Sequence, residues 1–349
     1  MHTETDTCSI CGNAAGNRAF TAREMMFGRR DSFEYLECAC CGCVQLKTVP
    51  DDLSPYYPDN YLGTAAGYEP RSALVRFLRH QRARHWLYGG NPLGRLLASM
   101  IGLPQDIGFG VSDPYAWLRR CGVGFDSDIL EVGCGAGSLL LMLRDDGFRN
   151  VEGVDLFVPE SLCYENGVRV LKADIYGIQK QYDLIMLHHT FEHMPEPLAV
   201  LRQLHRLLRP SRFVVIRIPV ASSCAYRTYG ADWAQLDAPR HLFLHTVRSM
   251  ELLAAASGFR ISDVTHDSTA FQFWASEQYL ADIPLRDERS YLTNPGASMF
   301  SPEQIAEFRR AAEDLNRRRD GDSACFYLEK KEEGNHRGAE GVLAEARRQ

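Results

Sequence analysis

The segment ILEVGCGAG, residues 129–137, constrains the fold of this chain more than any other part of the sequence. Its apolar start predicts a short strand, glycines follow at Gly133, Gly135 and Gly137, and the apolar run LLLML after Ser138 predicts a helix. Because glycine has no Cβ, such a turn lets the backbone approach a bound nucleotide closely. The segment therefore predicts a nucleotide-binding turn between a strand and a helix.

Apolar strands and helical segments alternate from residue 126 onward. The expected strands are DILEVG (128–133), NVEGVD (150–155), VRVLKAD (168–174), YDLIMLHH (182–189), RFVVIRIP (212–219) and FRISDVTHD (259–267). Four helices are expected between these strands. One lies near 137–146, a short one follows residue 155, one ends at LLRP (207–210), and one spans 246–257. This alternation predicts an α/β fold with a doubly wound, mostly parallel sheet covered by helices on both faces. Ligands of such sheets bind outside the carboxyl ends of the strands, where the glycine turn falls.

Four parts are expected along the chain. They are a zinc-binding module (1–54), a linker and helical segment (55–125), the cofactor-binding domain (126–285), and a C-terminal helix, strand and tail (286–349). The linker begins with an extended connection rich in proline and tyrosine (55–70). In the helix that follows, Leu74, Phe77 and Leu78 share one face and predict packing on the main domain, with arginines in solvent. Near the C-terminus, a helix over 301–319 and an edge strand ACFYLEK (324–330) are expected.

Six of the 11 cysteines fall within residues 8–43 and predict a small zinc ribbon. Cys8-x-x-Cys11 is followed by CACCGC, which offers a second pair as Cys38 with Cys41 or as Cys40 with Cys43. Glycine directly after Cys11 and Cys41 favours Cys8, Cys11, Cys38 and Cys41 as the ligands, with a hairpin between the two pairs. Four thiolates leave no open coordination position, so this Zn²⁺ is expected to be structural.

Composition narrows the function classes. The chain has 349 residues, a formal charge of −6 and 24% charged residues, which argues against a nucleic-acid partner. Its first residues lack the pattern of a signal peptide, and no apolar run is long enough to span a membrane. Scattered single cysteines suit a reducing compartment, so a cytoplasmic location is expected.

Three carboxylates at expected strand ends indicate which cofactor the turn holds. Ser138 occupies the last glycine position of a dinucleotide motif, and Glu131 before the turn would repel a pyrophosphate. Glu131 would suit a positively charged ligand, and S-adenosylmethionine carries an ammonium and a sulfonium. Asp155 would accept both ribose hydroxyls, and Asp174 the adenine amino group beside the backbone of Ile175. Cys134, Leu156 and His188 are expected to complete the cofactor site.

Through EVGCGAG, VEGVD and YDLIMLHHTFEHMPEPLAVLRQLHRLLRP, the sequence resembles the class I S-adenosylmethionine-dependent methyltransferases. More narrowly, the CxxC and CxxCG pairs, WAQLDAPRHLFLH and SEQYL resemble a bacterial subgroup that methylates saccharides and related small metabolites. The resemblance spans about residues 8–330. It implies methyl transfer to a small-molecule acceptor, and we expect a hydroxyl of a sugar, nucleotide-sugar or glycan end.

Histidines are the candidate bases for deprotonating such a hydroxyl. His241 ranks first, because it lies in the long segment after the fifth strand, and His189 and His193 are the other candidates. His241 matches the position of a proposed base in sugar carbon-methyltransferases, where a glutamate precedes it. Here Arg240 precedes it, which disfavours carbon methylation. An anchoring role for His241 stays open, as does packing rather than ligand stacking for Tyr229 and Trp233.

Parts of the sequence are compatible with three other functions. His189-Thr-Phe-Glu192-His193 matches the H-x-x-E-H pattern of inverted zinc peptidases, but the prolines in MPEP disfavour the continuous helix that this pattern needs. Glu192 and His193 could instead assist methyl transfer by binding a metal. A binding module is a further alternative, in which the ribbon and the arginines at 71–84 grip RNA or a partner and the cofactor fold is vestigial.

Overall fold

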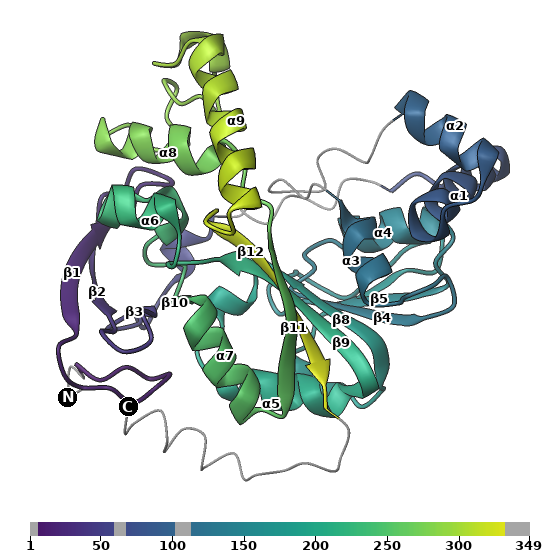
Figure 1. The fold of residues 1–349 in the computed structure, drawn as a ribbon, viewed down its shortest axis with the longest axis horizontal. Helices are drawn as coiled ribbons and strands as arrows, with labels where there is room; N and C mark the ends of the chain where they lie inside the picture. Colours follow the sequence, from purple (N-terminus) through teal and green to yellow (C-terminus); the bar gives the residue numbers. More distant parts are fainter. Residues whose placement is uncertain (1–5, 59–67, 102–112, 332–349) are drawn as a thin grey trace.

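Two β-sheets form the framework of the molecule (Figure 1). The computed structural model describes residues 6–58, 68–101 and 113–331. Three stretches of the sequence lie outside the described residues. They are 59–67 and 102–112, both in the expected linker and helical segment, and the tail, 332–349. The larger sheet has eight strands in the order β11-β12-β9-β8-β4-β5-β7-β6, and the smaller has four in the order β1-β2-β3-β10.

The larger sheet is mostly parallel, as the sequence predicts. Its strands are β4 (Asp128–Val132), β5 (Asn150–Val154), β6 (Leu162–Cys163), β7 (Arg169–Leu171), β8 (Tyr182–His188), β9 (Leu208–Pro219), β11 (Phe259–His266) and β12 (Ser323–Lys330). Strands β7, β5, β4, β8 and β9 pair in parallel. In the sheet, β5 lies on one side of β4 and β8 lies on the other, so the strand order reverses at β4. This reversal of strand order is where an open α/β sheet forms its ligand crevice.

Helices cover both faces of this sheet, which confirms the doubly wound arrangement (Figure 1). On one face, Leu130 and Val132 of β4 share a core with α5 (Pro197–Leu207) and α7 (Val247–Ala256). On the other face, Ile129 shares a core with α1 (Ala73–Tyr88), α3 (Pro114–Arg120) and α4 (Ser138–Asp145). Successive residues of β4 thus point into different cores, which explains its unbroken apolar sequence.

The remaining elements of the described residues are four α-helices and six short 3₁₀ turns. The α-helices are α2 (Pro92–Ile101), α6 (Cys224–Tyr229), α8 (Phe271–Leu280) and α9 (Pro302–Arg317). The 3₁₀ turns are η1 (Ser54–Tyr56), η2 (Ile175–Gly177), η3 (Phe191–His193), η4 (Gly230–Asp232), η5 (Ala234–Leu236) and η6 (Pro295–Ala297). No helix among the described residues is both long and apolar enough to cross a membrane.

Two expectations for the sheet are wrong. The strand ACFYLEK is β12, and it lies between β9 and β11, antiparallel to both, rather than at an edge. Its residues Ser323–Leu328 are all buried because both faces and both edges are covered. The short helix expected after NVEGVD is also absent, since bends over 156–160 lead into the antiparallel edge strand β6.

The packing of α1 differs from the prediction. Leu74 and Phe77 are 66% and 53% exposed, whereas Arg82 is buried and its guanidinium lies over the Trp86 ring. Arg79 Nε lies 2.8 Å from a carboxylate oxygen of the fully buried Asp146. A buried carboxylate needs a cation or hydrogen-bond donors, so the arginine side of the helix turns inward.

The N-terminal module contains the predicted hairpin, in which β1 (Arg18–Arg23) pairs antiparallel with β2 (Ser32–Glu37). Strand β3 (Val44–Leu46) pairs with β2 and with β10 (Phe243–Leu244). Because β10 belongs to the segment that follows β9, a strand from the larger domain completes the sheet of the module. Both parts share one continuous core. The module is therefore fixed directly against the segment that carries His241.

Candidate active site

The glycine turn joins β4 to α4 in a conformation that favours glycine. Gly133, Gly135 and Gly137 have φ values of +69°, +52° and +79°. A Cβ on Gly133 would also lie only 2.3 Å from Thr190 Cγ2. The turn is held by Asp155, which accepts a hydrogen bond of 2.9 Å from the Gly135 N–H. Strand β5 and the turn are thus tied together at the carboxyl edge of the sheet.

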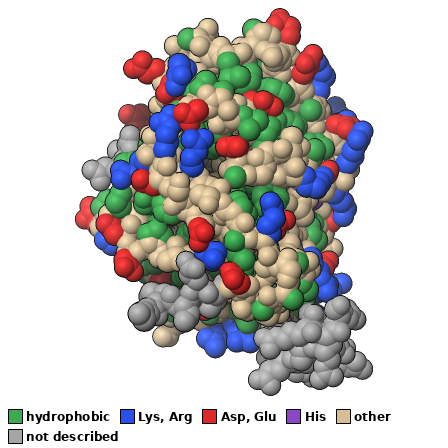
Figure 2. All heavy atoms as spheres, turned by 90° about the vertical axis from the view of Figure 1, so that its left-hand side faces the viewer, with side chains coloured by type: hydrophobic (Ala, Val, Ile, Leu, Met, Phe, Trp, Pro, Cys, Tyr) green, Lys and Arg blue, Asp and Glu red, His purple; other side chains and the backbone are tan. Residues whose placement is uncertain are grey.

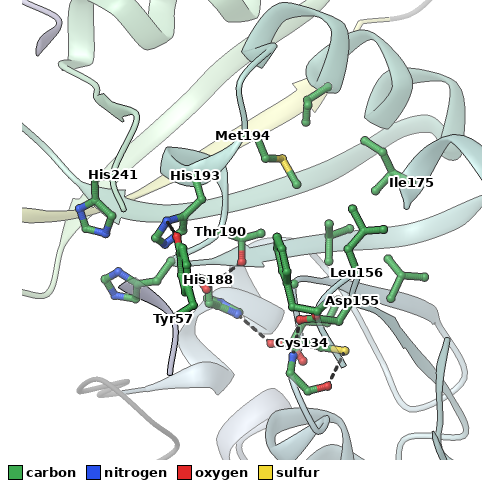
Figure 3. Close-up of a pocket in the computed structure, with 18 of the residues that line it drawn as sticks. Tyr57, Cys134, Asp155, Leu156, Ile175, His188, Thr190, His193, Met194 and His241 are labelled. Atoms are coloured by element: carbon green, nitrogen blue, oxygen red, sulfur yellow. Dashed lines mark hydrogen bonds and ion pairs between the residues drawn. The ribbon is translucent and has the colours of Figure 1, made fainter. Parts of the chain in front are cut away.

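A cavity of about 670 Å³ opens beside this turn (Figure 3). Every predicted cofactor residue except Gly137 lines it, together with all three candidate bases; these are Glu131, Gly133, Cys134, Gly135, Asp155, Leu156, Asp174, Ile175, His188, His189, His193 and His241. In Figure 3, His193 and His241 lie at one end, while Asp155, Leu156 and Ile175 lie at the other. Residues from β4, β5, β8 and the segment after β9 therefore converge on one space.

Glu131 presents an unpaired carboxylate oxygen at this cavity. The side chain is buried, its Oε1 lies 3.3 Å from His188 Nδ1, and its Oε2 has no hydrogen-bond partner in the described part of the chain. His188 is itself held by stacking on Trp117, with ring centroids 4.5 Å apart. A buried carboxylate oxygen without a donor is costly unless a ligand supplies one. The arrangement suits an ammonium group.

The opposite end combines carboxylates with apolar surface. Asp155 accepts the N–H of Phe157 at 2.7 Å, and Asp174 accepts those of Tyr176 and Gly177 at 2.9 and 3.1 Å. The side chains of Leu156 and Phe157 line the cavity although they are largely exposed. Burial raises the pKa of the Cys134 thiol, with a further effect from Glu131, so this thiol is neutral. A flat ring between apolar side chains with a carboxylate at its rim would fit this end.

His193 and His241 face each other at the other end, with ring centroids 4.8 Å apart. Each Nδ1 lies at hydrogen-bond distance from a backbone carbonyl, 2.8 Å from Arg240 O for His193 and 2.7 Å from Gln235 O for His241. A carbonyl only accepts, so both Nδ1 atoms carry a proton, and in the neutral form of each ring Nε2 holds the lone pair. The His241 Nε2 lies 3.9 Å from Glu192 Oε1.

Glu192 is fully buried behind these histidines. Its own burial opposes ionisation, but the hydrogen-bond interaction with His189 and the nearby His193 and His241 together lower its pKa to about 2. His189 Nδ1 lies 3.3 Å from Glu192 Oε1, and its Nε2 is in close contact with the Arg217 guanidinium. Because Arg217 can only donate, this Nε2 is an acceptor and is not available as a base. Residues 191–193 form a 3₁₀ turn rather than an α-helix, which argues against the peptidase pattern.

One further histidine and two aromatic residues of this region have structural roles. His245 is fully buried near Cys43 and Ser249, and burial lowers its pKa to about 4. Trp233 is also fully buried, and its Nε1–H donates to Asp322 at 3.0 Å. Tyr229 donates to Glu277 and is mostly buried. The aromatic side chains of this segment therefore pack rather than stack on a ligand.

Arg240 explains how the His241 segment is held. Its fully buried guanidinium pairs with Glu24 of the module at 2.9 Å and with Asp237 at 2.6 Å, and donates to the Tyr56 carbonyl at 3.1 Å. The residue that departs from the carbon-methyltransferase pattern is therefore a structural anchor. It fixes the backbone on which His241 sits.

The sequence did not reveal several residues that line the cavity, namely Met26, Tyr57, Gln235, Phe271 and Leu285. Tyr57 comes from the expected linker, stacks on Phe157 with nearly parallel rings, and its hydroxyl lies 3.3 Å from His193 Nδ1. Met26 comes from the N-terminal module. Their sequence surroundings carry no motif, and only the tertiary fold brings them to the site.

A second cavity of about 680 Å³ adjoins the first. The two share Met26, His189, Gln235, Phe271 and Leu285 in their walls. The second is lined by aromatic and polar side chains, which are Trp274, Tyr291, Ser268, Thr269, Arg217, Arg286, Arg309, Glu313 and Asp322. Burial raises the pKa of Asp322 to about 6. The mixture of ring faces and hydrogen-bonding groups fits a polar organic molecule.

The two cysteine pairs of the N-terminal module lie close together. Sulfur atoms of Cys8 and Cys41 lie 3.6 Å apart, and those of Cys11 and Cys38 lie 3.5 Å apart. All four thiols are buried and mutually within 4.8 Å. A tetrahedral site with Zn–S bonds of about 2.3 Å has sulfur–sulfur edges of roughly 3.8 Å, so the spacing fits. Backbone N–H groups of Cys40 and Cys41 point at Cys38 Sγ, as in a zinc knuckle.

Comparison with known proteins agrees with this geometry. A family model described as "Methyltransferase domain" matches residues 73–264. The ubiquinone biosynthesis O-methyltransferase of Pseudomonas aeruginosa strain UCBPP-PA14 is 30% identical over 166 residues, which cover 42% of this chain and 71% of that protein. The enzyme of the same name from Aeromonas salmonicida is 28% identical over 167 residues, 43% of this chain and 70% of that protein. The solved cyclopropane synthase MmaA2 from Mycobacterium tuberculosis has 16% identity and a TM-score of 0.41, covering 61% of this chain and 81% of that one.

A mostly parallel, doubly wound sheet with a glycine turn and the matching family model define a class I S-adenosylmethionine-dependent methyltransferase. The chain belongs to the methyltransferase domain family, and it is an enzyme of that class.

Proposed function

We propose that the enzyme methylates a hydroxyl of a small polar molecule, specifically a sugar, a nucleotide-sugar or a glycan end. The observation that carries this proposal is the second cavity, which adjoins the cofactor cavity and combines aromatic faces with polar and charged groups. Aromatic rings pack against the faces of sugars while polar groups bond their hydroxyls. Arg286 and Arg309 would meet an anionic group such as a diphosphate.

The residues around the first cavity fit S-adenosylmethionine. Glu131 Oε2 would accept from the ammonium, Asp155 from the ribose hydroxyls, and Asp174 from the adenine amino group. When bound, S-adenosylmethionine supplies a methyl group on a sulfonium, which is a good leaving group. Leu156 and Phe157 would cover the adenine and exclude water from it.

His241 is the candidate group for taking the proton of the acceptor hydroxyl. Its Nε2 keeps a lone pair because Nδ1–H donates to Gln235 O. Glu192 would stabilise the imidazolium that results, since it lies 3.9 Å from that Nε2. His193 would limit the space beside the hydroxyl, whereas His189 is engaged by Arg217 and holds Glu192.

An assay for S-adenosylhomocysteine release over free sugars, nucleotide-sugars and simple phenols tests this function. We expect turnover with a sugar-containing acceptor and a new O–CH₃ group in the NMR spectrum of the product. A C–CH₃ signal would instead support carbon methylation. Turnover with phenols alone would contradict the sugar assignment.

Arg309→Ala tests the second cavity as the acceptor site. Arg309 forms no salt bridge within the described part of the chain, so its removal should not disturb the fold. We expect the KM for an anionic acceptor to rise roughly 10-fold, as losing a charged hydrogen bond costs about 1.5 kcal/mol, with unchanged affinity for S-adenosylmethionine. Arg310→Ala, on the same helix but outside the cavity lining, is the matched control. Equal KM values for both variants would place the acceptor elsewhere.

We also propose that Cys8, Cys11, Cys38 and Cys41 bind one structural Zn²⁺. The four buried thiols and the N–H groups at Cys38 Sγ support it, while Cys40 is exposed and Cys43 lies in the core near His245. Such a site would stabilise a module whose own core is small.

Metal analysis of two variants tests the chosen ligands. Cys38→Ser should lose the zinc and lower the melting temperature, because three remaining thiolates hold the ion more weakly. Cys40→Ser should retain one zinc per chain, since its side chain is exposed. Zinc loss from Cys40→Ser with retention in Cys38→Ser would mean that the other cysteine register is used.

A nucleic-acid role finds little support in the module's charges. Arg18 pairs with Glu37, Arg29 with Asp31, and Arg30 with Asp282. Figure 2 shows Lys and Arg side chains interspersed with Asp and Glu on the face that it views. We therefore propose a small-molecule acceptor, no nucleic-acid or membrane partner, and a cytoplasmic location, which unpaired cysteines suit.

A further inference from the structure

We propose that Glu192, His193 and His241 form a binding site for one divalent metal ion at the wall of the cofactor cavity. One potential ligand atom from each side chain lies within 4.8 Å of the other two. A carboxylate with two imidazoles suits first-row ions such as Co²⁺ and Zn²⁺ and leaves coordination positions open. This site is separate from the cysteine cluster, where four thiolates would fill all coordination positions of their own ion.

The two histidines are prepared as ligands by their backbone contacts. Metal ions bind the nitrogen that lacks a proton, and a ligating histidine usually donates its other N–H to a carbonyl or carboxylate. Here His193 Nδ1 contacts Arg240 O at 2.8 Å and His241 Nδ1 contacts Gln235 O at 2.7 Å. Both Nε2 atoms are therefore lone-pair donors. The buried Arg240 cluster holds one of these carbonyls in place.

The carboxylate between them lacks the partners that burial normally demands. Glu192 is fully buried, and among the described residues its carboxylate has only the long contact with His189 and no hydrogen bond of regular geometry. Its contacts with His189 Nδ1 at 3.3 Å and His241 Nε2 at 3.9 Å are longer than a charged hydrogen bond. A cation bound between the Glu192 carboxylate and the two Nε2 atoms would compensate this buried charge.

The position of the cluster indicates what the ion would do. His193 and His241 line the cofactor cavity (Figure 3). His189 and Gln235 line both cavities. The open positions of the ion would therefore face the junction where the acceptor hydroxyl must meet the methyl donor. This step rests on the proposed function, but with the ion bound His241 Nε2 would be a ligand instead of the base. The ion would then lower the pKa of the acceptor hydroxyl, so that its proton leaves to water. An acceptor with two neighbouring hydroxyls, as in a sugar or a catechol, would chelate the ion through both oxygens.

Co²⁺ titration of the full chain that carries a single Zn²⁺, with all further zinc removed by dialysis, tests the site without using activity. Visible absorption reports Co²⁺ bound to nitrogen and oxygen ligands, and the zinc content measured before and after excludes exchange at the cysteines. We expect one Co²⁺ per chain. His193→Gln and Glu192→Gln should weaken its binding at least ~10-fold. His188→Gln, which lines the same cavity outside the cluster, should bind as the wild type does.

Because Glu192 is buried, its variant could lose Co²⁺ binding simply by misfolding. His193→Gln distinguishes the loss of a ligand from misfolding, since the His193 side chain is only partly buried. No Co²⁺ binding by the wild type, or equal binding by wild type and His193→Gln, would overturn the metal site. S-adenosylhomocysteine release measured on the same samples keeps the two proposals apart. Methyl transfer without Co²⁺ binding would refute only the ion, and Co²⁺ binding without transfer to any hydroxyl compound would refute only the function.

Discussion

His241→Ala is expected to lower kcat roughly 100-fold or more, the usual contribution of a group that takes up a proton. The His241 ring lines the cavity with its Nε2 3.9 Å from Glu192 Oε1, and His193 is the other lining histidine whose Nδ1 faces a backbone carbonyl. His189 faces the Arg217 guanidinium, and His188 stacks on Trp117 and contacts Glu131. Loss of His241 therefore removes the proton acceptor, or an ion ligand, while the cofactor contacts remain.

Steady-state kinetics and calorimetry on the same preparation check this prediction. The affinity for S-adenosylmethionine should stay within about twofold of the wild type, since Glu131 and Asp155 are untouched. His80→Ala, on α1 and outside the cavity lining, is the control for replacing a histidine. A wild-type kcat for His241→Ala would show that the residue only anchors its segment through Gln235.

Asp155→Ala is expected to weaken S-adenosylmethionine binding by ~1–3 kcal/mol, the cost of losing charged hydrogen bonds. Three effects would add in this variant. The ribose hydroxyls would lose the acceptor that we propose for them, and the Gly135 N–H would lose the 2.9 Å bond that ties the glycine turn to β5. The Phe157 N–H also loses its partner.

Isothermal titration of wild type and variant gives the difference directly. Asp145→Ala is a useful comparison, because Asp145 is a buried carboxylate at the end of α4, away from the cavity lining. It should leave cofactor affinity unchanged even if it lowers the melting temperature. Unchanged affinity in Asp155→Ala would refute the ribose contact.

The sequence predicted the features that depend on neighbouring residues. The glycine turn needs three residues at positive φ, so its spacing is visible without any tertiary information. Strand β4 is apolar because both of its faces are covered, and the acidic residues at the ends of β4 and β5 then meet by the geometry of a parallel sheet. The Cys38 and Cys41 register followed from the glycine after Cys41, which has φ of +70° at Gly42.

The features that were missed depend on contacts between distant segments. An apolar run such as ACFYLEK suits an edge or an interior strand equally, and only its pairing with β9 and β11 decides. The inward side of α1 is set by the buried Asp146, which local periodicity does not show. Tyr57 reaches His193 because Arg240 anchors the neighbouring Tyr56 carbonyl, a contact across 184 residues of sequence.

The most direct test of the cofactor site is a crystal structure of the chain with S-adenosylhomocysteine bound. We expect the ligand's ammonium at Glu131 Oε2, its ribose hydroxyls at Asp155 and its adenine beside Leu156 and Asp174. A ligand that lies outside this cavity, or one whose ammonium and ribose contact neither Glu131 nor Asp155, would contradict it.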